Sequence, residues 1–213
     1  MSKLRFDVVS LFPEAFENFF NHGLIKKAFE EKIASIHIHN PRDHAIDNYR
    51  KVDDEPYGGG AGMVLKPEPY FSVFDQIPKL NKKKILLMTP QGRKISQSDF
   101  SRWSKEDQLI LICGSYEGFD ERIRSLADEE ISIGDFVLTG GEIPAITVIN
   151  GVVRLLPGTL GSAESLEEES HNELLLEHPQ YTRPSEFKGM KVPDVLLSGN
   201  HKLIKEWRQK QRE

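Results

Sequence analysis

The sequence predicts an α/β fold built on a mainly parallel β-sheet. Short apolar stretches alternate with longer amphipathic stretches, and this alternation is typical of parallel sheets whose strands are joined by helices. The apolar stretches contain few polar residues, as expected for strands that are covered on both faces. The predicted strands are Phe6–Leu11, Ile33–His39, Lys84–Met88, Leu109–Cys113 and Glu130–Ile133.

Helices are predicted between most of these strands, and two of them carry recognisable start signals. Pro67 fits the first turn of a helix, and Ser96-Gln-Ser-Asp99 has the residues of a capped helix start. The predicted helices comprise residues 13–32, 67–76, 96–104 and 119–127.

A further predicted helix, Glu142–Leu156, is apolar almost all the way round. A helix without a solvated face is normally buried, either in a core or against another subunit. Thr147, Asn150 and Arg154 form its one polar stripe, at a spacing that places them on one face. A buried arginine needs an anion or a carbonyl as partner. Arg154 therefore either forms a structural ion pair or points into a buried site.

Length and composition indicate a globular protein with one solid core and a small second unit. The chain has 213 residues, of which 38% are hydrophobic and 29% charged. The N-terminus lacks the features of a signal peptide, and no apolar run approaches the roughly 18 residues of a membrane span. Cys113 is the only cysteine, so we expect a buried thiol and neither a disulfide framework nor a cysteine metal cluster. We expect a cytoplasmic protein that does not enter a membrane.

Charge divides the chain near its C-terminus. Residues 162–177 hold six acids and no Lys or Arg, whereas residues 183–213 hold eight bases and four acids. The net charge of −5 argues weakly against a general nucleic-acid coat, but its distribution matters more than its sum. We predict a large unit over residues 1–161, a flexible acidic linker over 162–177 and a small helical unit over 178–213.

Three glycine-bearing loops follow three successive predicted strands: Thr89–Arg93, Gly114–Gly118 and Gly134–Glu142. In open parallel sheets ligands bind at the carboxyl ends of the strands, so these loops could converge on one small ligand. The alternative is that the glycines end strands for conformational reasons only.

Common ligand motifs do not account for these loops. The glycine cluster Gly58–Gly62 follows a polar run and not a strand, so it is a poor dinucleotide-binding motif. A Walker A loop, a zinc-protease helix and a serine nucleophile elbow are absent from the sequence. His37 and His39 lie on one face of a predicted strand near Asp43 and His44, where a metal site is possible and a solvated sheet edge is favoured.

The chain closely resembles the bacterial tRNA (guanine-N1)-methyltransferases of the SPOUT class (TrmD type). The matching motifs run in order across almost the whole chain. They are FDVVSLFPEAF at Phe6–Phe16, NPRD at Asn40–Asp43, VDDEPYGGGAGMV at Val52–Val64, CGSYEGFDER at Cys113–Arg122, IGDFVLTGGE at Ile133–Glu142, RLLPGTLG at Arg154–Gly161, and YTRP and LLSGNH near the end.

This resemblance implies a deep trefoil knot in the large unit, which no sequence pattern would propose because knots are so rare. It implies that S-adenosylmethionine binds in the knotted loops and that homodimers build each site from both chains. It also implies that tRNA binds the small C-terminal unit, where basic residues would meet phosphates. The cofactor-binding residues it implies are Pro90, Gly92, Gly114, Tyr116, Glu117, Ile133, Gly134, Leu138, Gly140 and Gly141.

The reaction implied by the resemblance is methylation of N1 of the guanine just 3′ of the anticodon, at tRNA position 37. Guanine N1 must lose a proton before it can attack, and Glu169 stands where the family has its aspartate base. His171 is a weaker alternative base. Arg154 could stabilise the negative charge that develops on O6 of the guanine.

The resemblance places Tyr57, Gly58 and Gly59 near the target guanine. Asp53 and Asp54 either position the base or a Mg²⁺ ion, or cap the turn that follows.

The sequence departs from the family pattern at several positions. Ser115 replaces an arginine, whose role is therefore in doubt, and His44 and His171 stand where aromatic residues are common. The chain ends at Glu213 inside an apparent basic helix that family members usually continue. These departures leave two alternatives: a relative that binds cofactor and RNA without methylating, and a SPOUT enzyme that modifies another RNA or base atom.

Overall fold

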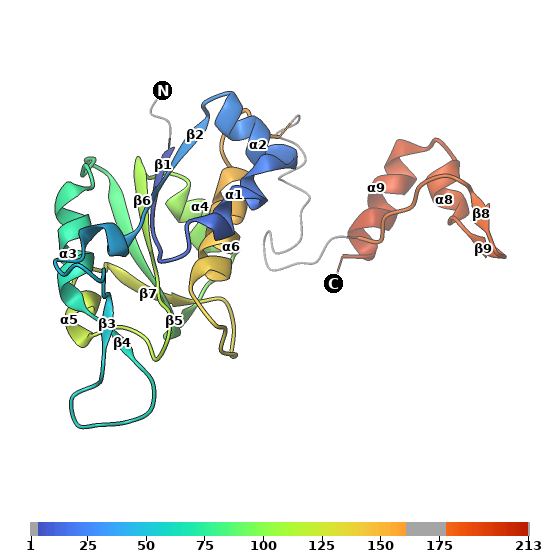
Figure 1. Ribbon diagram of the computed structural model, residues 1–213. Helices are drawn as coiled ribbons and strands as arrows, with labels where there is room; N and C mark the ends of the chain where they lie inside the picture. The colour runs from blue at the N-terminus through green and yellow to red at the C-terminus, as the bar shows by residue number, and fades with distance from the viewer. Residues whose placement is uncertain (1–3, 161–177, 213) are drawn as a thin grey trace. The chain divides into compact units, whose positions relative to one another are not determined.

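The computed structural model describes residues 4–160 and 178–212. Contacts between residues divide the chain into two compact units, Met1–Gly161 and Ser162–Glu213. Figure 1 shows the elements of both units.

The large unit is built on five parallel strands in the order β2-β1-β6-β5-β7. This confirms the predicted mainly parallel sheet, and each strand overlaps a predicted one. The strands are β1 (Leu4–Val9), β2 (Ala34–His39), β5 (Lys83–Lys94), β6 (Gln108–Cys113) and β7 (Glu129–Ser132). A short antiparallel hairpin pairs β3 (Asp53–Asp54) with β4 (Val64–Leu65).

Strand β5 continues to Lys94, well beyond the end at Met88 that the sequence indicates. Its pairing with β7 is interrupted, because Met88 and Arg93 both oppose Ile131. Residues 89–92 therefore leave the regular ladder between these two positions. The loop expected at Thr89–Arg93 is an irregular stretch within a longer strand.

Helices cover both faces of the sheet (Figure 1). One core cluster joins α1 (Glu14–Glu17), α2 (Gly23–Glu30), α4 (Gln97–Trp103) and α6 (Glu142–Val153) to the sheet. The other joins α3 (Pro67–Gln76) and α5 (Glu121–Arg124) to the opposite face. Residues of β6 alternate between the clusters, with Leu111 in the first and Ile112 in the second. This period of two explains why β6 is apolar without a break from Leu109 to Cys113.

The single helix predicted over residues 13–32 is wrong, because the chain turns within it. The 3₁₀ helix η1 (Phe19–Asn21) follows α1, and His22 is extended before α2 begins at Gly23. Gly23 has φ +59°, a conformation that glycine adopts without steric cost. The predicted bounds of α3 are confirmed, and the expected capping box of α4 is present, with Asp99 accepting from the Ser96 N–H at 2.9 Å.

Helix α6 is enclosed only in part within this chain, so the core of this chain alone does not bury it; burial of the rest against another subunit, the expected alternative, stays a prediction. Val148, Ile149 and Val152 are fully buried, but Ile143 is 57% exposed. In the polar stripe, Thr147 and Arg154 are half-buried and Asn150 is exposed. The open part of the helix therefore contains both the polar stripe and an apolar residue.

A buried carboxylate on β1 joins three neighbouring strands, β2, β1 and β6. Asp7 is fully buried and accepts hydrogen bonds from Arg5 at 2.7 Å, from His39 Nε2 at 2.8 Å and from Gln108 at 2.7 Å. Burial by itself would raise the pKa of Asp7, but these partners outweigh it and hold that pKa well below its ordinary value. His39 is thus held by a carboxylate, whereas His37 is exposed.

The small unit contains a two-stranded hairpin, β8 (Glu186–Phe187) and β9 (Met190–Lys191), followed by α8 (Asp194–Leu197) and α9 (His201–Lys210). The Asn200 side chain accepts a hydrogen bond from the Leu203 N–H and begins α9. Among the described residues 178–212 only His178 is buried. No helix within the described ranges of either unit is long and apolar enough to span a membrane.

Candidate active site

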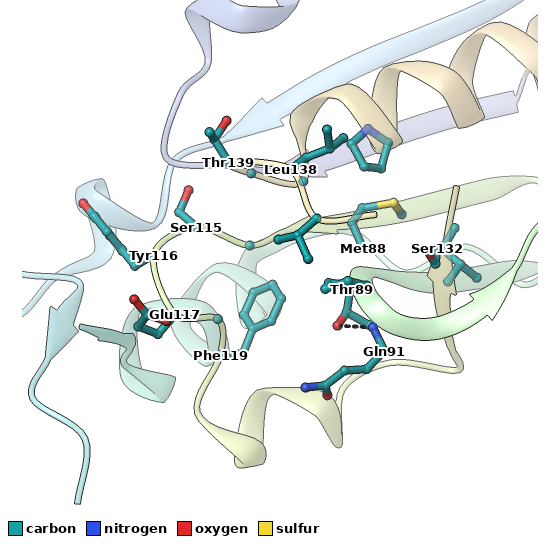
Figure 2. Close-up of a pocket in the computed structure, with 18 of the residues that line it drawn as sticks. Met88, Thr89, Gln91, Ser115, Tyr116, Glu117, Phe119, Ser132, Leu138 and Thr139 are labelled. Carbon is teal, nitrogen blue, oxygen red and sulfur yellow. Dashed lines mark hydrogen bonds between the residues drawn. The ribbon is translucent and has the colours of Figure 1, made fainter. Parts of the chain in front are cut away.

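A cavity of about 390 Å³ lies at the irregular stretch within β5 and at the ends of β6 and β7. The three glycine-bearing loops line it together, as predicted from their positions at the carboxyl ends of parallel strands. In Figure 2 the Phe119 ring points into the space between the segments that carry Thr89 and Leu138.

Most of the predicted cofactor residues line this cavity. They are Pro90, Gly114, Tyr116, Glu117, Ile133, Leu138, Gly140 and Gly141. Gly92 and Gly134 are not among the lining residues. A side chain at Gly92 would collide with the backbone of β7, and one at Gly134 would collide with the Phe136 ring. These two glycines permit close packing behind the wall.

Sequence reasoning missed several lining residues beside the glycines. Their position next to the loop motifs was the available signal, but no motif distinguished the side chains that face inward. The main ones are Met88, Thr89, Gln91, Phe119, Ser132, Val137, Thr139 and Pro144.

The two innermost loops are joined through their backbones. The Gly141 N–H donates to the Gly114 carbonyl at 2.9 Å, and Ser115 pairs with Gly140 as an isolated β-bridge. A Cβ at Gly141 would lie 2.7 Å from Cys113 Cα and 2.8 Å from Gly114 N. Only glycine allows this approach, so Gly141 sets the distance between the loops.

A buried carboxylate supports the same loop from behind. Glu142 begins α6, is 9% exposed and accepts a hydrogen bond from Ser10 Oγ at 2.6 Å. Ser10 Oγ also accepts from the Phe12 N–H at 3.0 Å. The end of β1 is thereby tied to the residue that follows Gly140 and Gly141.

The Gly114–Gly118 loop, which follows β6, is held in an uncommon conformation. Tyr116 has φ +58°, which a bulky residue adopts only under constraint. Its hydroxyl accepts a hydrogen bond from Arg42 at 3.2 Å, and Figure 2 shows the side chain directed away from Phe119. The hydrogen bond to Arg42 thus helps to hold this loop open at the rim of the cavity.

The β3–β4 hairpin is hydrogen-bonded to the Gly114–Gly118 loop. The Glu117 N–H donates to Met63 at 3.0 Å, and the Leu65 N–H donates to Gly118 at 2.9 Å. Tyr57 at the hairpin tip is fully exposed, and Gly58 and Gly59 have φ of +90° and +77°. The predicted guanine-binding residues therefore stand outside the cavity on a loop bonded to its rim.

Asp54 has local partners at the base of that hairpin. Its carboxylate accepts from Lys51 Nζ and from the Glu55 N–H, both at 3.0 Å. The Lys51 hydrogen bond lowers the pKa of Asp54. Neither partner lies in the Gly58–Gly62 turn, so these contacts do not decide between the two expected roles of Asp54. Among the described residues no group of three or more His, Cys, Asp or Glu is placed to hold a metal ion.

Two positions that depart from the family pattern have defined surroundings. Ser115 is 8% exposed at the cavity wall. His44 contacts helix α3, where Ser72 Oγ lies 3.4 Å and Gln76 Nε2 3.3 Å from its Nδ1. Ser115 therefore belongs to the site itself, whereas His44 packs beside it.

Of the residues expected to carry the chemistry, Arg154 lies in the described part of the chain. It is half-buried at the C-terminal end of α6 and is not a lining residue of the cavity. Glu169 and His171 lie outside the described residues.

An ion-pair network supports the outer wall, where β5 continues past the cavity. Arg93 contacts Asp99 at 2.6 Å and Glu129 at 2.7 Å, and Arg102 contacts the same two carboxylates at 2.9 and 2.5 Å. The Arg93 and Arg102 guanidiniums hold the pKa of Asp99 below its ordinary value. The hydrogen bonds from Arg102, chiefly, lower the pKa of Glu129 to about 2.

We expect this network to make folding stability fall in acid. The folded-state pKa of Glu129 lies below its unfolded value, so its contribution is present above about pH 4.5 and is lost as the pH falls toward 2. The free energy of unfolding in urea, measured at pH 7 and at pH 3, shows this loss. Glu129→Gln should remove on the order of 2 kcal/mol at pH 7 and less at pH 3. The control Glu30→Gln, in an exposed pair with Lys26, should change little at either pH. Equal losses for Glu129→Gln at both pH values would contradict this account.

Comparison with known proteins gives one consistent result. The family model described as "tRNA (Guanine-1)-methyltransferase TrmD" matches residues 4–213. Two similar curated proteins are tRNA (guanine-N(1)-)-methyltransferases of Synechococcus sp. strains CC9311 and WH7803. They are 64% and 65% identical over 100% of this chain and over 90% and 88% of their own lengths. A crystal structure of tRNA (m1G37) methyltransferase from Aquifex aeolicus is similar with a TM-score of 0.81 and 41% identity. The match covers 96% of this chain and 87% of that one.

Proposed function

We propose that this chain, which belongs to the tRNA (guanine-1)-methyltransferase TrmD family, methylates N1 of the guanine at tRNA position 37, with S-adenosylmethionine as methyl donor. The observation that carries the proposal is identity of 64% and 65% to two tRNA (guanine-N1)-methyltransferases over the whole chain. The test is nucleoside analysis of tRNA after reaction with methyl-labelled donor. Label in 1-methylguanosine is expected, and label in another nucleoside would redirect the assignment.

The cavity suits the cofactor in size and chemistry. Its volume of about 390 Å³ lies within the range of ligand sites, roughly 300–1,000 Å³. Apolar side chains such as Leu138 and Ile133 could enclose the adenine, and the backbone groups of the glycine loops could bind its edge. The Glu117 and Glu121 carboxylates could bind the hydroxyl or ammonium groups. When bound, the cofactor supplies a methyl group on a positively charged sulfur.

We expect Gly141→Ala to weaken S-adenosylmethionine binding by at least about tenfold, because the added methyl group forces the two inner loops apart. Isothermal titration calorimetry measures this change without any RNA. Gly23→Ala is the control for backbone strain away from the cavity, since Gly23 has φ +59° but a Cβ added there would meet no atom within 4 Å. Wild-type affinity in Gly141→Ala would show that the inner loops do not form the cofactor site.

Two side chains would act on the guanine. Glu169 would accept the N1 proton as general base, which leaves N1 with the electron pair that attacks the methyl carbon. Arg154 would stabilise the negative charge on O6 as that proton leaves. The chain's remaining task is alignment of N1 with the bond that breaks. These roles rest on the family motif at Arg154 and on the carboxylate at the family's base position.

The partners follow from the same proposal. The substrate is tRNA, and a basic C-terminal unit suits binding to its phosphates.

We propose a homodimer with sites shared between subunits. The open part of α6 supports it, because Ile143 is 57% exposed and Phe19, in the helical segment that covers the same face of the sheet, is 38% exposed. We also propose that the large unit contains the family's trefoil knot. The protein would act in the cytoplasm, where tRNA is modified.

A Mg²⁺ ion is the remaining proposed component. Mg²⁺ prefers carboxylate, phosphate and water oxygens. Asp53 and Asp54 are adjacent carboxylates at the base of the hairpin that carries Tyr57. RNA phosphates and water would supply the other ligands. Activity titrated against Mg²⁺ with Asp54→Asn compared to wild type would test this part alone.

A further inference from the structure

The small C-terminal unit contains a second cavity, of about 380 Å³. Three rings stand around it: the Trp207 ring lies 6.3 Å from both the His178 ring and the Tyr181 ring, at angles of 62° and 59°. Apolar side chains of α8 and α9, including Leu196 and Ile204, complete its wall. Tyr181 is 49% exposed, so its ring is accessible from solvent within this unit.

His178 offers a defined hydrogen-bonding group in this cavity. It is 6% exposed, and its Nδ1 lies 3.2 Å from the Pro179 carbonyl oxygen. A carbonyl oxygen only accepts, so Nδ1 carries a proton, and in the neutral form of the ring Nε2 is then an acceptor. Nε2 is buried and has no hydrogen-bond partner among the described residues. An unpartnered polar atom on a residue of the cavity wall suits a ligand with an N–H or O–H donor.

Charge identifies the class of that ligand. Residues 178–212 contain eight Lys or Arg and three Asp or Glu. Arg183 and Arg208 line the cavity, and no hydrogen bond or ion pair joins either side chain to a described residue. Aromatic rings beside free guanidiniums suit a planar base joined to a phosphate. An apolar peptide segment would offer the two guanidiniums only neutral carbonyl oxygens and no anionic group.

We propose that this cavity receives one unpaired nucleobase of the tRNA. The base would stack on Tyr181 and Trp207, and an amino or imino N–H of the base would donate to His178 Nε2. The adjacent phosphate would contact Arg208 or Arg183. The inference rests on the proposed function only in taking tRNA as the ligand.

The test is equilibrium tRNA binding to the full chain without S-adenosylmethionine, so that its outcome is independent of methyl transfer. Transcripts carry single abasic sites at each unpaired position in turn. For wild type we expect one abasic site to weaken binding by about fivefold or more, the loss of one stacked base. In Tyr181→Ala that same abasic site should have no further effect. His178→Phe keeps an aromatic ring but removes the acceptor. It should therefore lose only the preference for bases that carry an N–H donor.

Lys205→Ala is the matched control. Lys205 is exposed on α9 but does not line the cavity, so its loss should weaken all transcripts equally and lower the salt dependence of binding. A direct signal is also available, because Trp103 is fully buried and Trp207 is the only other tryptophan. Binding should quench Trp207 fluorescence with the intact transcript and less with the transcript whose abasic site weakens binding.

Two results would overturn the proposal. One is that Tyr181→Ala weakens binding of every transcript by the same factor, which would make the rings a structural core. The other is that Tyr181→Ala changes the protein's mass in light scattering without RNA, which would make this face a protein interface. A wild-type protein that binds tRNA as expected but forms no 1-methylguanosine would instead count against the proposed reaction alone.

Discussion

Glu169→Gln is expected to slow methyl transfer to tRNA by about 10²- to 10⁴-fold, the usual contribution of a general base. Glutamine keeps the size and polarity of the side chain but cannot take the proton from guanine N1. Single-turnover rates with saturating S-adenosylmethionine and tRNA measure the chemical step directly. The affinity for S-adenosylmethionine should stay unchanged, because the proposed cofactor-binding residues lie between Pro90 and Gly141.

Two variants control this experiment. Glu169→Asp restores the residue of the family pattern and should remain active. Glu168→Gln removes the neighbouring acid and should react at nearly the wild-type rate. If Glu169→Gln also reacts at that rate, Glu169 is not the base, and His171→Ala becomes the variant to test.

Arg154→Ala is expected to slow the same step by about 10²- to 10³-fold. This is the usual effect of removing a group that stabilises a developing oxyanion. Arg154→Lys should recover part of the rate, because a lysine keeps the charge but not the fork of donors. The rate at saturating substrate should fall, while S-adenosylmethionine binding is retained because Arg154 does not line the cavity.

Asn150→Ala is the matched control for Arg154, because it lies one turn earlier on the same side of α6. It should leave the single-turnover rate within a few fold of wild type. An Arg154→Ala variant that loses stability or cofactor binding, with an unchanged single-turnover rate, would support the structural ion pair instead.

The sheet could be predicted from the sequence because each strand contains a short apolar stretch and the central strand β6 is buried on both faces. Local signals also placed α3, whose proline fits its first turn, and the capping box at Ser96 and Asp99. The break at His22 and Gly23 was missed because it depends on how α1 and α2 pack against α6. Spacing along the sequence cannot express that packing.

The candidate site was predictable to the level of loops. Glycines after parallel strands indicate a shared ligand site, and the structure brings those loops together. The order of the strands in space was not predictable, nor was the contact between Ser10 and Glu142, which are 132 residues apart. The inward direction of Phe119 depends on the conformation of Tyr116 and on the β3–β4 hairpin, both of which are set by tertiary contacts.

The most direct test of the proposed function compares two tRNA transcripts that differ only in guanine or adenine 3′ of the anticodon. Each is incubated with wild-type protein and methyl-labelled S-adenosylmethionine, and the product is mapped by nucleoside analysis. We predict 1-methylguanosine on the guanine transcript and no label on the other. Equal labelling of both transcripts, or no labelling while cofactor and tRNA both bind, would contradict the assignment of this chain as a guanine-N1 methyltransferase.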